Sequence, residues 1–405
     1  MQTIDSLIRE SCQKYSDQPA LCYKLAGAWQ NMTYGALWEL SDHVAAGMIK
    51  NGFKNGDHAA LLAPSSPQWI AAYLGILKAG GVVVPIDKEL KAAELRHILT
   101  DCDARLVFTA PPCLDLVLEI FNDIPALRTI VTLTPTAGDD NSQVVQVLDV
   151  LVEEWRELIT TVELPAERRA TMEALTRQVY RLLSPPGSDP GGKTEQADPF
   201  DPGKRLRSKL RRRGKLLPLA TLCHSAPLPD KPRNPSDTAV ILYTSGTTGR
   251  SKGAMLSHAN IVSNIKGAAA HFRLDNSIHT LSFLPINHVF EQVCGVLLPL
   301  SLGGKVSFCE SLKKLGENLA EVKPTFFLAV PVVYRMILDR VLKNINSKKL
   351  AQLLFSLPLT RSIVTSKVRE TFGSGTIFIS GGAALDPAIA MGLRELQAWE
   401  KTAHE

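Results

Sequence analysis

Hydroxyl groups, glycines and a lysine crowd one short stretch of the chain. Residues 243–255 read Tyr-Thr-Ser-Gly-Thr-Thr-Gly-Arg-Ser-Lys-Gly-Ala-Met. Glycines let backbone N–H groups approach the oxygens of a ligand closely, hydroxyl groups donate hydrogen bonds, and Lys252 supplies positive charge. The stretch therefore predicts a loop that holds a polyphosphate, with binding residues Thr244, Ser245, Gly246, Thr247, Thr248, Gly249 and Lys252.

The spacing within this loop separates it from the Walker A loop of P-loop NTPases. A Walker A loop has four residues between its glycines, followed by Gly-Lys-Ser/Thr. Here two residues separate Gly246 from Gly249, and Lys252 is followed by Gly253. The chain also has no obvious Walker B carboxylate. We therefore disfavour a P-loop NTPase and expect a phosphate loop of another lineage.

The order Tyr-Thr-Ser-Gly-Thr-Thr-Gly-x-x-Lys-Gly closely resembles the signature loop of the adenylate-forming superfamily, which includes acyl-CoA synthetases and luciferases. Three later segments resemble the same superfamily, and the first two are closest to long-chain fatty acyl-CoA synthetases. They are Leu284-Pro-Ile-Asn-His288 with Phe290-Glu291, then Pro324-Thr-Phe-Phe-Leu-Ala-Val-Pro331, and the turn Gly381-Gly382-Ala383 after an apolar strand.

The resemblance implies ATP-dependent activation of a carboxylic acid, most simply a long-chain fatty acid, through an acyl-adenylate. Coenzyme A would then accept the acyl group, with transfer to an acyl carrier protein or release of acyl-AMP as alternatives. The resemblance also implies Mg²⁺ and places His288, Gly381, Gly382 and Ala383 in the pocket for acid and nucleotide. Each of these residues also has a purely structural interpretation. His288 would then be a buried histidine, and Glu291 would be a carboxylate on a helix surface or in an ion pair. The glycines would form an ordinary turn at the end of a strand.

Members of the superfamily carry further segments that this sequence does not contain. These include a Tyr-Gly-x-Thr-Glu segment whose Glu binds magnesium, and a small C-terminal domain whose lysine promotes adenylation. We therefore assign no catalytic residue and no metal ligand, and expect little turnover from the 405-residue chain by itself. The alternative is a truncated, non-catalytic module that binds nucleotide or acyl ligands.

Apolar strands alternate with amphipathic helices along the chain, which predicts an α/β fold with mainly parallel sheets. Strands are expected at 58–63, 82–85, 105–109, 129–133 and 239–243, and helices at 67–78, 92–101, 113–121 and 258–272. Ser257 is the expected N-cap of the last helix, so the phosphate loop should lie between a strand and a helix. The resemblance implies the N-terminal large domain of an adenylate-forming enzyme, incomplete at its C-terminus. Its predicted parts are a first α/β subdomain at 1–181, a flexible insertion at 182–235 and a second α/β subdomain at 236–405.

The predicted insertion is rich in proline and glycine and ends in a strongly basic run. Eight of the thirteen residues from Gly203 to Lys215 are Lys or Arg. Such a run is most simply a solvated loop. Among ligands that it could bind, anionic lipid is favoured over nucleic acid, because no aromatic residue interleaves it for base stacking. We expect no nucleic-acid partner, and peripheral membrane contact would use 203–215.

The overall composition is that of a globular protein, with 45% hydrophobic and 21% charged residues. No apolar run is long enough to span a bilayer, and residues 1–18 lack the apolar core of a signal peptide. The seven cysteines form no Cys-x-x-Cys pair, which argues against a disulfide scaffold or a zinc site. These features predict a cytoplasmic protein with reduced thiols.

Overall fold

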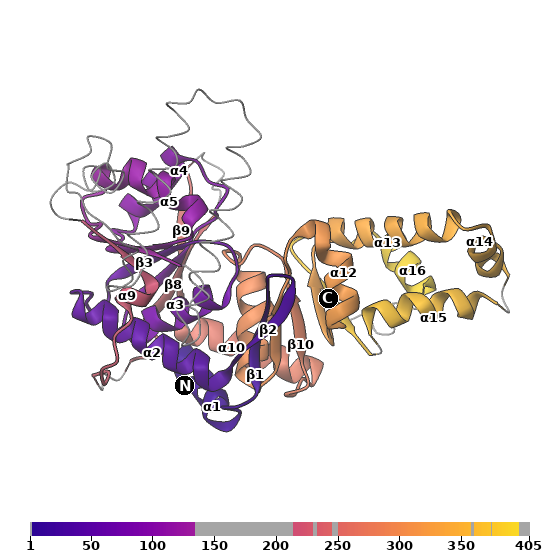
Figure 1. Cartoon of the computed structure of the whole chain (residues 1–405), viewed down its shortest axis with the longest axis horizontal. Helices are drawn as coiled ribbons and strands as arrows, with labels where there is room; N and C mark the ends of the chain where they lie inside the picture. Colours follow the sequence, from indigo (N-terminus) through magenta and orange to yellow (C-terminus); the bar gives the residue numbers. More distant parts are fainter. Residues whose placement is uncertain are drawn as a thin grey trace, which may run out of the picture.

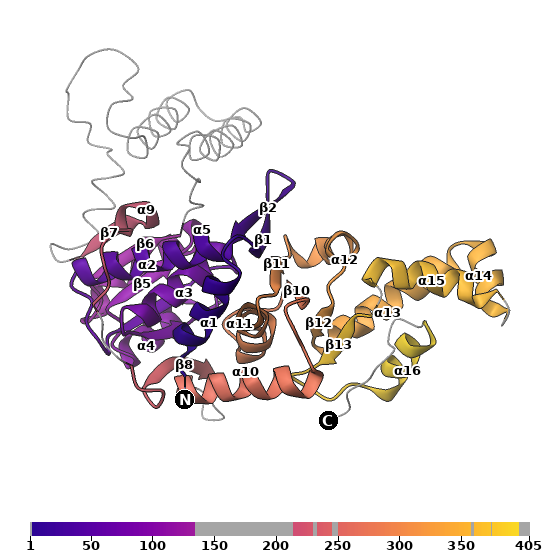
Figure 2. The same cartoon turned by 90° about the horizontal axis from the view of Figure 1, so that it is seen from below.

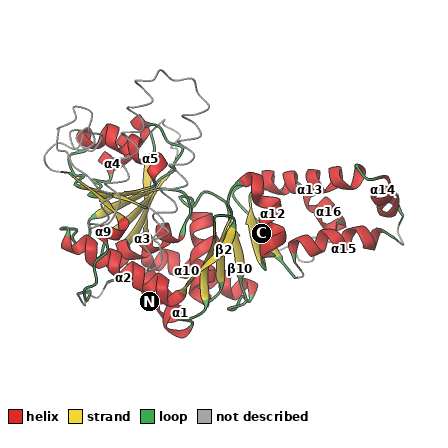
Figure 3. Cartoon of the chain, in the orientation of Figure 1, coloured by secondary structure: helices red, strands yellow, loops and turns green. Residues whose placement is uncertain are grey.

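The computed structural model describes residues 2–133, 214–229, 233–244, 250–357, 360–373 and 375–396 of the chain. Two β-sheets lie side by side (Figure 1). The helices within residues 331–395 project beyond the second sheet and form an arm at one end of the molecule (Figure 1). Helices pack against both sheets (Figure 3). The protein is α/β with two mainly parallel sheets, which confirms the predicted fold class.

The first sheet has seven strands in the order β7-β6-β5-β3-β4-β8-β9. Its strands are β3 (His58–Leu62), β4 (Val82–Pro85), β5 (Leu106–Thr109), β6 (Thr129–Thr132), β7 (Lys215–Pro218), β8 (Thr238–Thr244) and β9 (Lys252–Ser257). All neighbours are parallel except β8 and β9, which form an antiparallel hairpin. The strands predicted between 58 and 133 and at 239–243 are confirmed to within one residue at each end.

Helices cover both faces of the first sheet. Helices α2 (Tyr34–Lys50) and α3 (Pro67–Lys78) lie on one face, and α4 (Ala92–Asp101) and α5 (Pro111–Ile120) lie on the other (Figure 1). Alternate residues of the strands pack into two separate apolar clusters, one with each pair of helices. Because both faces are covered, the inner strands β3, β4 and β5 are mostly apolar, as expected of parallel strands buried on two sides.

Helix α3 is the most deeply buried helix of this layer. All twelve of its residues are buried, including Lys78 at its C-terminal end. The side-chain oxygen of Ser66 accepts a hydrogen bond from the Trp69 N–H at 3.2 Å and so caps the helix, and Pro67 fits its first turn. The rings of Trp69 and Tyr73 stack with centroids 5.5 Å apart. Local capping and apolar content therefore agree with the burial of this helix.

The second sheet has six strands in the order β13-β12-β10-β11-β1-β2. Its strands are β1 (Pro19–Leu25), β2 (Ala28–Thr33), β10 (His279–Ser282), β11 (Lys305–Phe308), β12 (Phe326–Ala329) and β13 (Ile377–Ser380). Strands β1 and β2 form an antiparallel hairpin, and the other neighbours are parallel. Helix α10 (His258–Phe272) connects β9 of the first sheet to β10 of the second (Figure 2).

Each sheet contains a hairpin from the other part of the chain. The hairpin β1–β2 joins the second sheet, although it lies within the predicted first subdomain at 1–181. The hairpin β8–β9 joins the first sheet, although it lies within the predicted second subdomain at 236–405. The pattern of one hairpin predicts its strands but carries no information on which sheet edge they join, so the two sheets do not follow the predicted division of the chain.

The predicted insertion at 182–235 lies mostly outside the described residues, and so does most of its basic run at 203–215. Its C-terminal portion is described and belongs to the first sheet: β7 pairs with β6, and the short helix α9 (Leu219–Leu222) follows. Leu219 and Leu222 are buried against α2, where Gly47 leaves room for the Leu222 carbonyl. The prediction of a flexible segment was therefore wrong for 215–222, because the short run Leu-Leu-Pro-Leu is stabilised by a distant strand.

The remaining helices complete the N-terminal layer and the arm. They are α1 (Ile4–Lys14), the 3-10 helices η1 (Phe121–Asp123) and η3 (Leu312–Lys314), the π-helix η2 (Phe290–Leu297), α11 (Leu298–Leu302), α12 (Leu315–Val322), α13 (Pro331–Asn346), α14 (Lys349–Ser356), α15 (Arg361–Phe372) and α16 (Pro387–Glu395). In the part of the chain that the structure describes, none of the helices has the length and apolar content needed to cross a bilayer.

Candidate functional site

The predicted phosphate loop connects the two strands of the β8–β9 hairpin. Thr244, the last residue of β8, pairs with Lys252, the first residue of β9. Ser245, Gly246, Thr247, Thr248 and Gly249 lie outside the described residues. The prediction that the loop leads from a strand directly into a helix was wrong, because the six-residue strand β9 separates the loop from α10. The predicted N-cap of that helix, Ser257, is confirmed.

Strand β9 has a weak signal in the sequence. It begins Lys-Gly-Ala, and glycine, alanine and lysine are all depleted in strands. Pairing with β8 along its whole length stabilises it instead. Gly253 is required at this position, because a Cβ there would lie 2.7 Å from the side chain of Ile241. This glycine, which follows the predicted phosphate-binding residues, therefore allows close packing within the hairpin.

Helix α4, which covers the first sheet, contacts the β8–β9 hairpin close to the two ends of the loop. The Tyr243 hydroxyl donates a hydrogen bond to the Asp101 carboxylate at 2.5 Å, and the His97 ring lies 3.0 Å from the Ser251 carbonyl oxygen. Burial and the neighbouring Asp101 carboxylate raise the pKa of Tyr243, so the phenol keeps its proton and remains a donor. These supports were not predicted, because no sequence pattern links α4 with a loop so distant in the chain.

Lys252 is the basic residue that was predicted to bind phosphate. Its side chain is exposed, as is that of Arg250. Within the described residues, no carboxylate forms an ion pair with Lys252. An ammonium group without a carboxylate partner, held at the start of a paired strand, is available to an anionic ligand.

A second group of predicted residues gathers at one edge of the second sheet. The parallel neighbours β13, β12 and β10 end at Ser380, Ala329 and Ser282. His288 follows β10, and the turn at residues 381–383 follows β13. Open α/β sheets bind ligands outside the carboxyl ends of their strands. Three segments that are widely separated in the sequence therefore meet where such a fold places a ligand.

Direct contacts join these segments. The ring of Phe290 packs so closely on Gly381 that a Cβ on this glycine would lie 2.7 Å from it. Gly382 has a φ of +79°, and a Cβ there would meet the Val330 side chain at 3.4 Å. Both glycines are therefore needed for geometry, the first for close approach and the second for its backbone conformation.

His288 lies at the surface of this edge and not in the core. Its side chain is exposed, so a buried histidine, the alternative without function, does not apply. Its N–H donates to the Pro285 carbonyl at 3.1 Å, and its carbonyl accepts from the Gln292 N–H at 3.0 Å. The backbone of His288 is thus fixed by the start of a helical segment, while its imidazole remains open to a ligand.

Glu291 differs most from its predicted role. It was expected on a helix surface or in an ion pair, but it is 1% exposed. Its Oε1 has no hydrogen-bond partner among the described residues, and its carboxylate folds against Gly295 within the π-helix η2. Burial raises the pKa of Glu291 to about 8, so the group is largely protonated at neutral pH. The π-helix has no recognisable sequence signal, although such turns occur often at functional sites.

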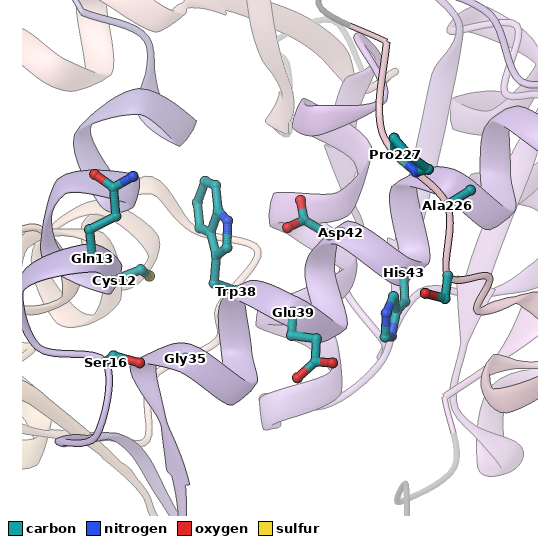
Figure 4. A pocket seen from close by; sticks show the side chains of 11 residues that line it. Cys12, Gln13, Ser16, Gly35, Trp38, Glu39, Asp42, His43, Ala226 and Pro227 are labelled. Atoms are coloured by element: carbon teal, nitrogen blue, oxygen red, sulfur yellow. The ribbon is translucent and has the colours of Figure 1, made fainter.

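A cavity of about 650 Å³ lies away from both groups, between α1, α2 and the segment at 225–227 (Figure 4). Glu39, Asp42 and His43 point toward it from α2 (Figure 4). Its thiol, Cys12, has a pKa raised to about 12 by burial and is a poor nucleophile. The cavity includes none of the predicted site residues.

The described residues contain no set of ligands for a metal. No three His, Cys, Asp or Glu side chains in the described ranges come close enough together to hold an ion. All seven cysteines are free thiols, as predicted. The donors present here therefore do not form a magnesium site, and no step below depends on the metal.

Comparison with known protein families finds a match over nearly the whole chain. The family model described as AMP-binding enzyme matches residues 8–402. Peroxisomal long chain acyl-CoA synthetase 7 of Arabidopsis thaliana is 25% identical over 389 residues, which cover 91% of this chain and 46% of that protein. The human long-chain-fatty-acid–CoA ligase ACSBG2 is 25% identical over 418 residues, covering 96% of this chain and 53% of that protein. The chain thus spans about half the length of these relatives.

Solved structures show the same fold. The adenylation domain of a carboxylate reductase from Mycobacterium chelonae superposes with a TM-score of 0.70 at 21% identity, covering 98% of this chain and 56% of that one. The N-terminal domain of FACL13 from Mycobacterium tuberculosis superposes with a TM-score of 0.61 at 19% identity, covering 97% and 73%. At such identities the superpositions establish the arrangement of the two sheets and leave the chemistry to be argued from residues.

Proposed function

Because the chain belongs to the AMP-binding enzyme family, we propose that it serves the ATP-dependent activation of a carboxylic acid. In this reaction a carboxylate oxygen attacks the α-phosphorus of ATP, the bond between the α- and β-phosphates breaks, and pyrophosphate leaves. The product is a mixed anhydride of the acid and AMP. Coenzyme A then displaces AMP through its thiol, which loses a proton and forms a thioester.

We propose a long-chain fatty acid as the substrate and coenzyme A as the acceptor. Support comes from the names of the relatives, which are a long chain acyl-CoA synthetase and a long-chain-fatty-acid–CoA ligase. Identity of 25% supports the reaction class better than the chain length of the acid. The apolar strand β12, whose end lies between the two parts of the acid site, is consistent with an acyl substrate.

In this proposal the β8–β9 hairpin holds the phosphates. Thr244 and Lys252 fix the two ends of the loop, and the exposed ammonium of Lys252 neutralises charge on the β- and γ-phosphates. The hydroxyl and glycine residues at 245–249 would supply hydrogen bonds. Mg²⁺ supplies charge neutralisation in related chemistry, but the described residues offer no site for it, so these residues are given only binding and orienting roles.

The acid would bind at the carboxyl edge of β10, β12 and β13. His288 is open to a carboxylate there and could donate a hydrogen bond to it, while Phe290, Gly381 and Val330 form an apolar wall. The observation that carries the proposal is the contact of Phe290 with Gly381. Both residues belong to segments that resemble the adenylate-forming superfamily and lie about 90 residues apart in the sequence. Their contact lies at the carboxyl ends of the strands, where open α/β sheets bind ligands.

Exchange of labelled pyrophosphate into ATP, with and without a long-chain fatty acid, tests the proposal. We expect acid-dependent exchange or, if the chain acts only as a binding module, ATP-dependent retention of the fatty acid. Gly381→Ala should weaken fatty-acid binding by about tenfold, because the new Cβ displaces Phe290. Gly316→Ala, whose Cβ would meet no atom within 4 Å, is the matched control. Hydrolysis of ATP without any dependence on acid would contradict the proposal.

A further inference from the structure

Helix α14 lies at the tip of the arm, as far from the first sheet as any described helix (Figures 1 and 2). Helices α13 and α15 run out to it and back, and α14 packs on these two helices (Figure 1). None of its eight residues is fully buried. The arm thus holds a short helix well away from both candidate binding groups.

The helix is apolar on two opposite faces. Ala351 and Phe355, four residues apart, pack against the core of the arm. Leu350 and Leu353, three residues apart, lie on the outer face with exposed fractions of 70% and 57%. Leu357, the residue that follows the helix, is 47% exposed. A helix that is apolar all round is normally buried. Here nothing in the described part of the chain covers the outer face.

The part of the chain that includes this face is rich in basic residues. Between residues 340 and 369 the chain has seven basic residues and no Asp or Glu: Arg340, Lys343, Lys348, Lys349, Arg361, Lys367 and Arg369. Lys348 and Lys349 immediately precede the exposed leucines and are themselves exposed. Arg361 pairs with Glu395 across the arm, whereas Lys343, Lys348 and Lys349 form no ion pair with any described carboxylate.

We propose that the outer face of α14, with Lys348 and Lys349, is a docking surface for an anionic phospholipid bilayer. Leucines on one face of a helix enter the boundary between headgroups and acyl chains, and adjacent lysines contact anionic headgroups. An eight-residue helix is about 12 Å long, far shorter than the bilayer core, so it lies in the interface and does not span it.

The charge also argues against the other obvious occupant, a second copy of the chain. A two-fold contact through this face would place Lys348 and Lys349 of both copies in one interface. Like charges brought together at an interface disfavour association. An anionic surface, in contrast, gains from each lysine that approaches it. The apolar face and the charge around it therefore favour the same partner.

This assignment differs from the one that the sequence favours. By composition, the basic run at 203–215 would be the surface for anionic lipid, but it contains only two leucines and no aromatic residue. The tip of the arm combines charge with exposed apolar side chains, and stable membrane attachment usually needs both. The two basic regions are far enough apart in the sequence to be changed independently.

Co-sedimentation with lipid vesicles tests the inference on the full chain. Wild-type protein should bind vesicles of phosphatidylcholine mixed with phosphatidylglycerol, bind phosphatidylcholine alone weakly, and be released by salt. Leu350→Ser combined with Leu353→Ser should weaken binding by about tenfold or more, and so should Lys348→Glu combined with Lys349→Glu. Because these side chains are exposed, thermal unfolding should remain at the wild-type temperature in both variants.

Two controls match the variants in chemistry but not in location. Leu312→Ser changes a leucine that is 63% exposed and also lies beside two lysines, and Lys50→Glu with Lys54→Glu reverses two exposed charges near the first sheet. Both should leave vesicle binding at the wild-type level. Three results would overturn the inference: no binding of wild-type protein to anionic vesicles, unchanged binding of the α14 variants, or wild-type dimers that the leucine variant converts to monomers.

Discussion

Helices α3 and α14 are both rich in apolar side chains, but they occupy opposite environments. All twelve residues of α3 are buried between the first sheet and α2, whereas none of the eight residues of α14 is. The difference lies in what surrounds each helix and not in its composition. Apolar sequence therefore predicts a preference for leaving water, and the fold decides whether core or surface satisfies it.

The largest effect should come from emptying the space that α3 fills. Trp69→Ala removes a ring that is 1% exposed and stacks on Tyr73. We expect a loss of about 3–5 kcal/mol in the free energy of unfolding, because the cavity cannot collapse between packed layers. Urea denaturation followed by circular dichroism measures this. A loss below about 1 kcal/mol would mean that α3 is not the rigid layer described here.

The contrast extends to buried charged groups. Lys78 on α3 is buried with the Asp42 carboxylate 2.9 Å away and with the Trp38 carbonyl and the Ser41 hydroxyl as further partners. Glu291 on η2 is buried with no cation beside it. Helix α2 therefore supplies the buried Lys78 with partners, while the candidate acid site contains a carboxyl group that burial keeps protonated.

Replacing Glu291 by Gln should change the pH dependence of stability. The pKa of this carboxyl is raised from 4.5 to about 8 on folding, so between these pH values the folded state holds a proton that the unfolded chain lacks. Wild-type stability should therefore fall as pH rises from about 4.5 to about 8, and Glu291→Gln should remove that slope. We expect the variant to be more stable than wild type by about 2–4 kcal/mol at pH 8 and nearly equal to it at pH 4.5.

Denaturation at a series of pH values measures this slope, with Glu310→Gln as the control. Glu310 is an exposed carboxylate whose pKa is lowered by its hydrogen bond to Asn318 and by Lys24. Its replacement should leave the slope between pH 4.5 and pH 8 as in wild type. Parallel profiles for wild type and Glu291→Gln would show that the Glu291 carboxyl is not held neutral.

The smallest effect on stability should come from the outer face of α14. Leu350→Ser with Leu353→Ser should change the free energy of unfolding by less than about 0.5 kcal/mol per site, because both side chains are exposed. Replacing a buried apolar residue on α3 should therefore cost much more folding free energy than replacing exposed apolar residues on α14. A loss of several kcal/mol would show that some other part of the protein covers these leucines.

Local signals explain which elements could be predicted from the sequence. Helix α10 was predicted from 258 to 272 because Ser257 caps it and its apolar residues repeat with helical spacing. Strand β9, the pairing of β7 and the exchange of hairpins between sheets were not predicted, since each depends on a partner strand elsewhere in the chain. Burial of Glu291 was missed for the same reason.

The candidate site likewise has features that the sequence predicts and features that only the fold shows. Glycine, hydroxyl and lysine residues at 244–252 predicted a phosphate loop from composition alone, and family resemblance singled out His288 and Gly381. Their individual roles stay predictions. Only the strand order β13-β12-β10 brings the segments of His288 and Gly381 to one edge, and only helix packing shows that His97 and Asp101 support the phosphate hairpin.

The affinity of the chain for ATP, measured by titration calorimetry on wild type and Lys252→Ala, tests the central claim most directly. The exposed ammonium of Lys252 has no ion-pair partner among the described residues, so its loss should cost nucleotide binding and not folding. We expect ATP binding to weaken by about tenfold or more, with an unchanged melting temperature, while Lys266→Ala on α10 binds as wild type does. Equal affinity of wild type and well-folded Lys252→Ala would contradict the account.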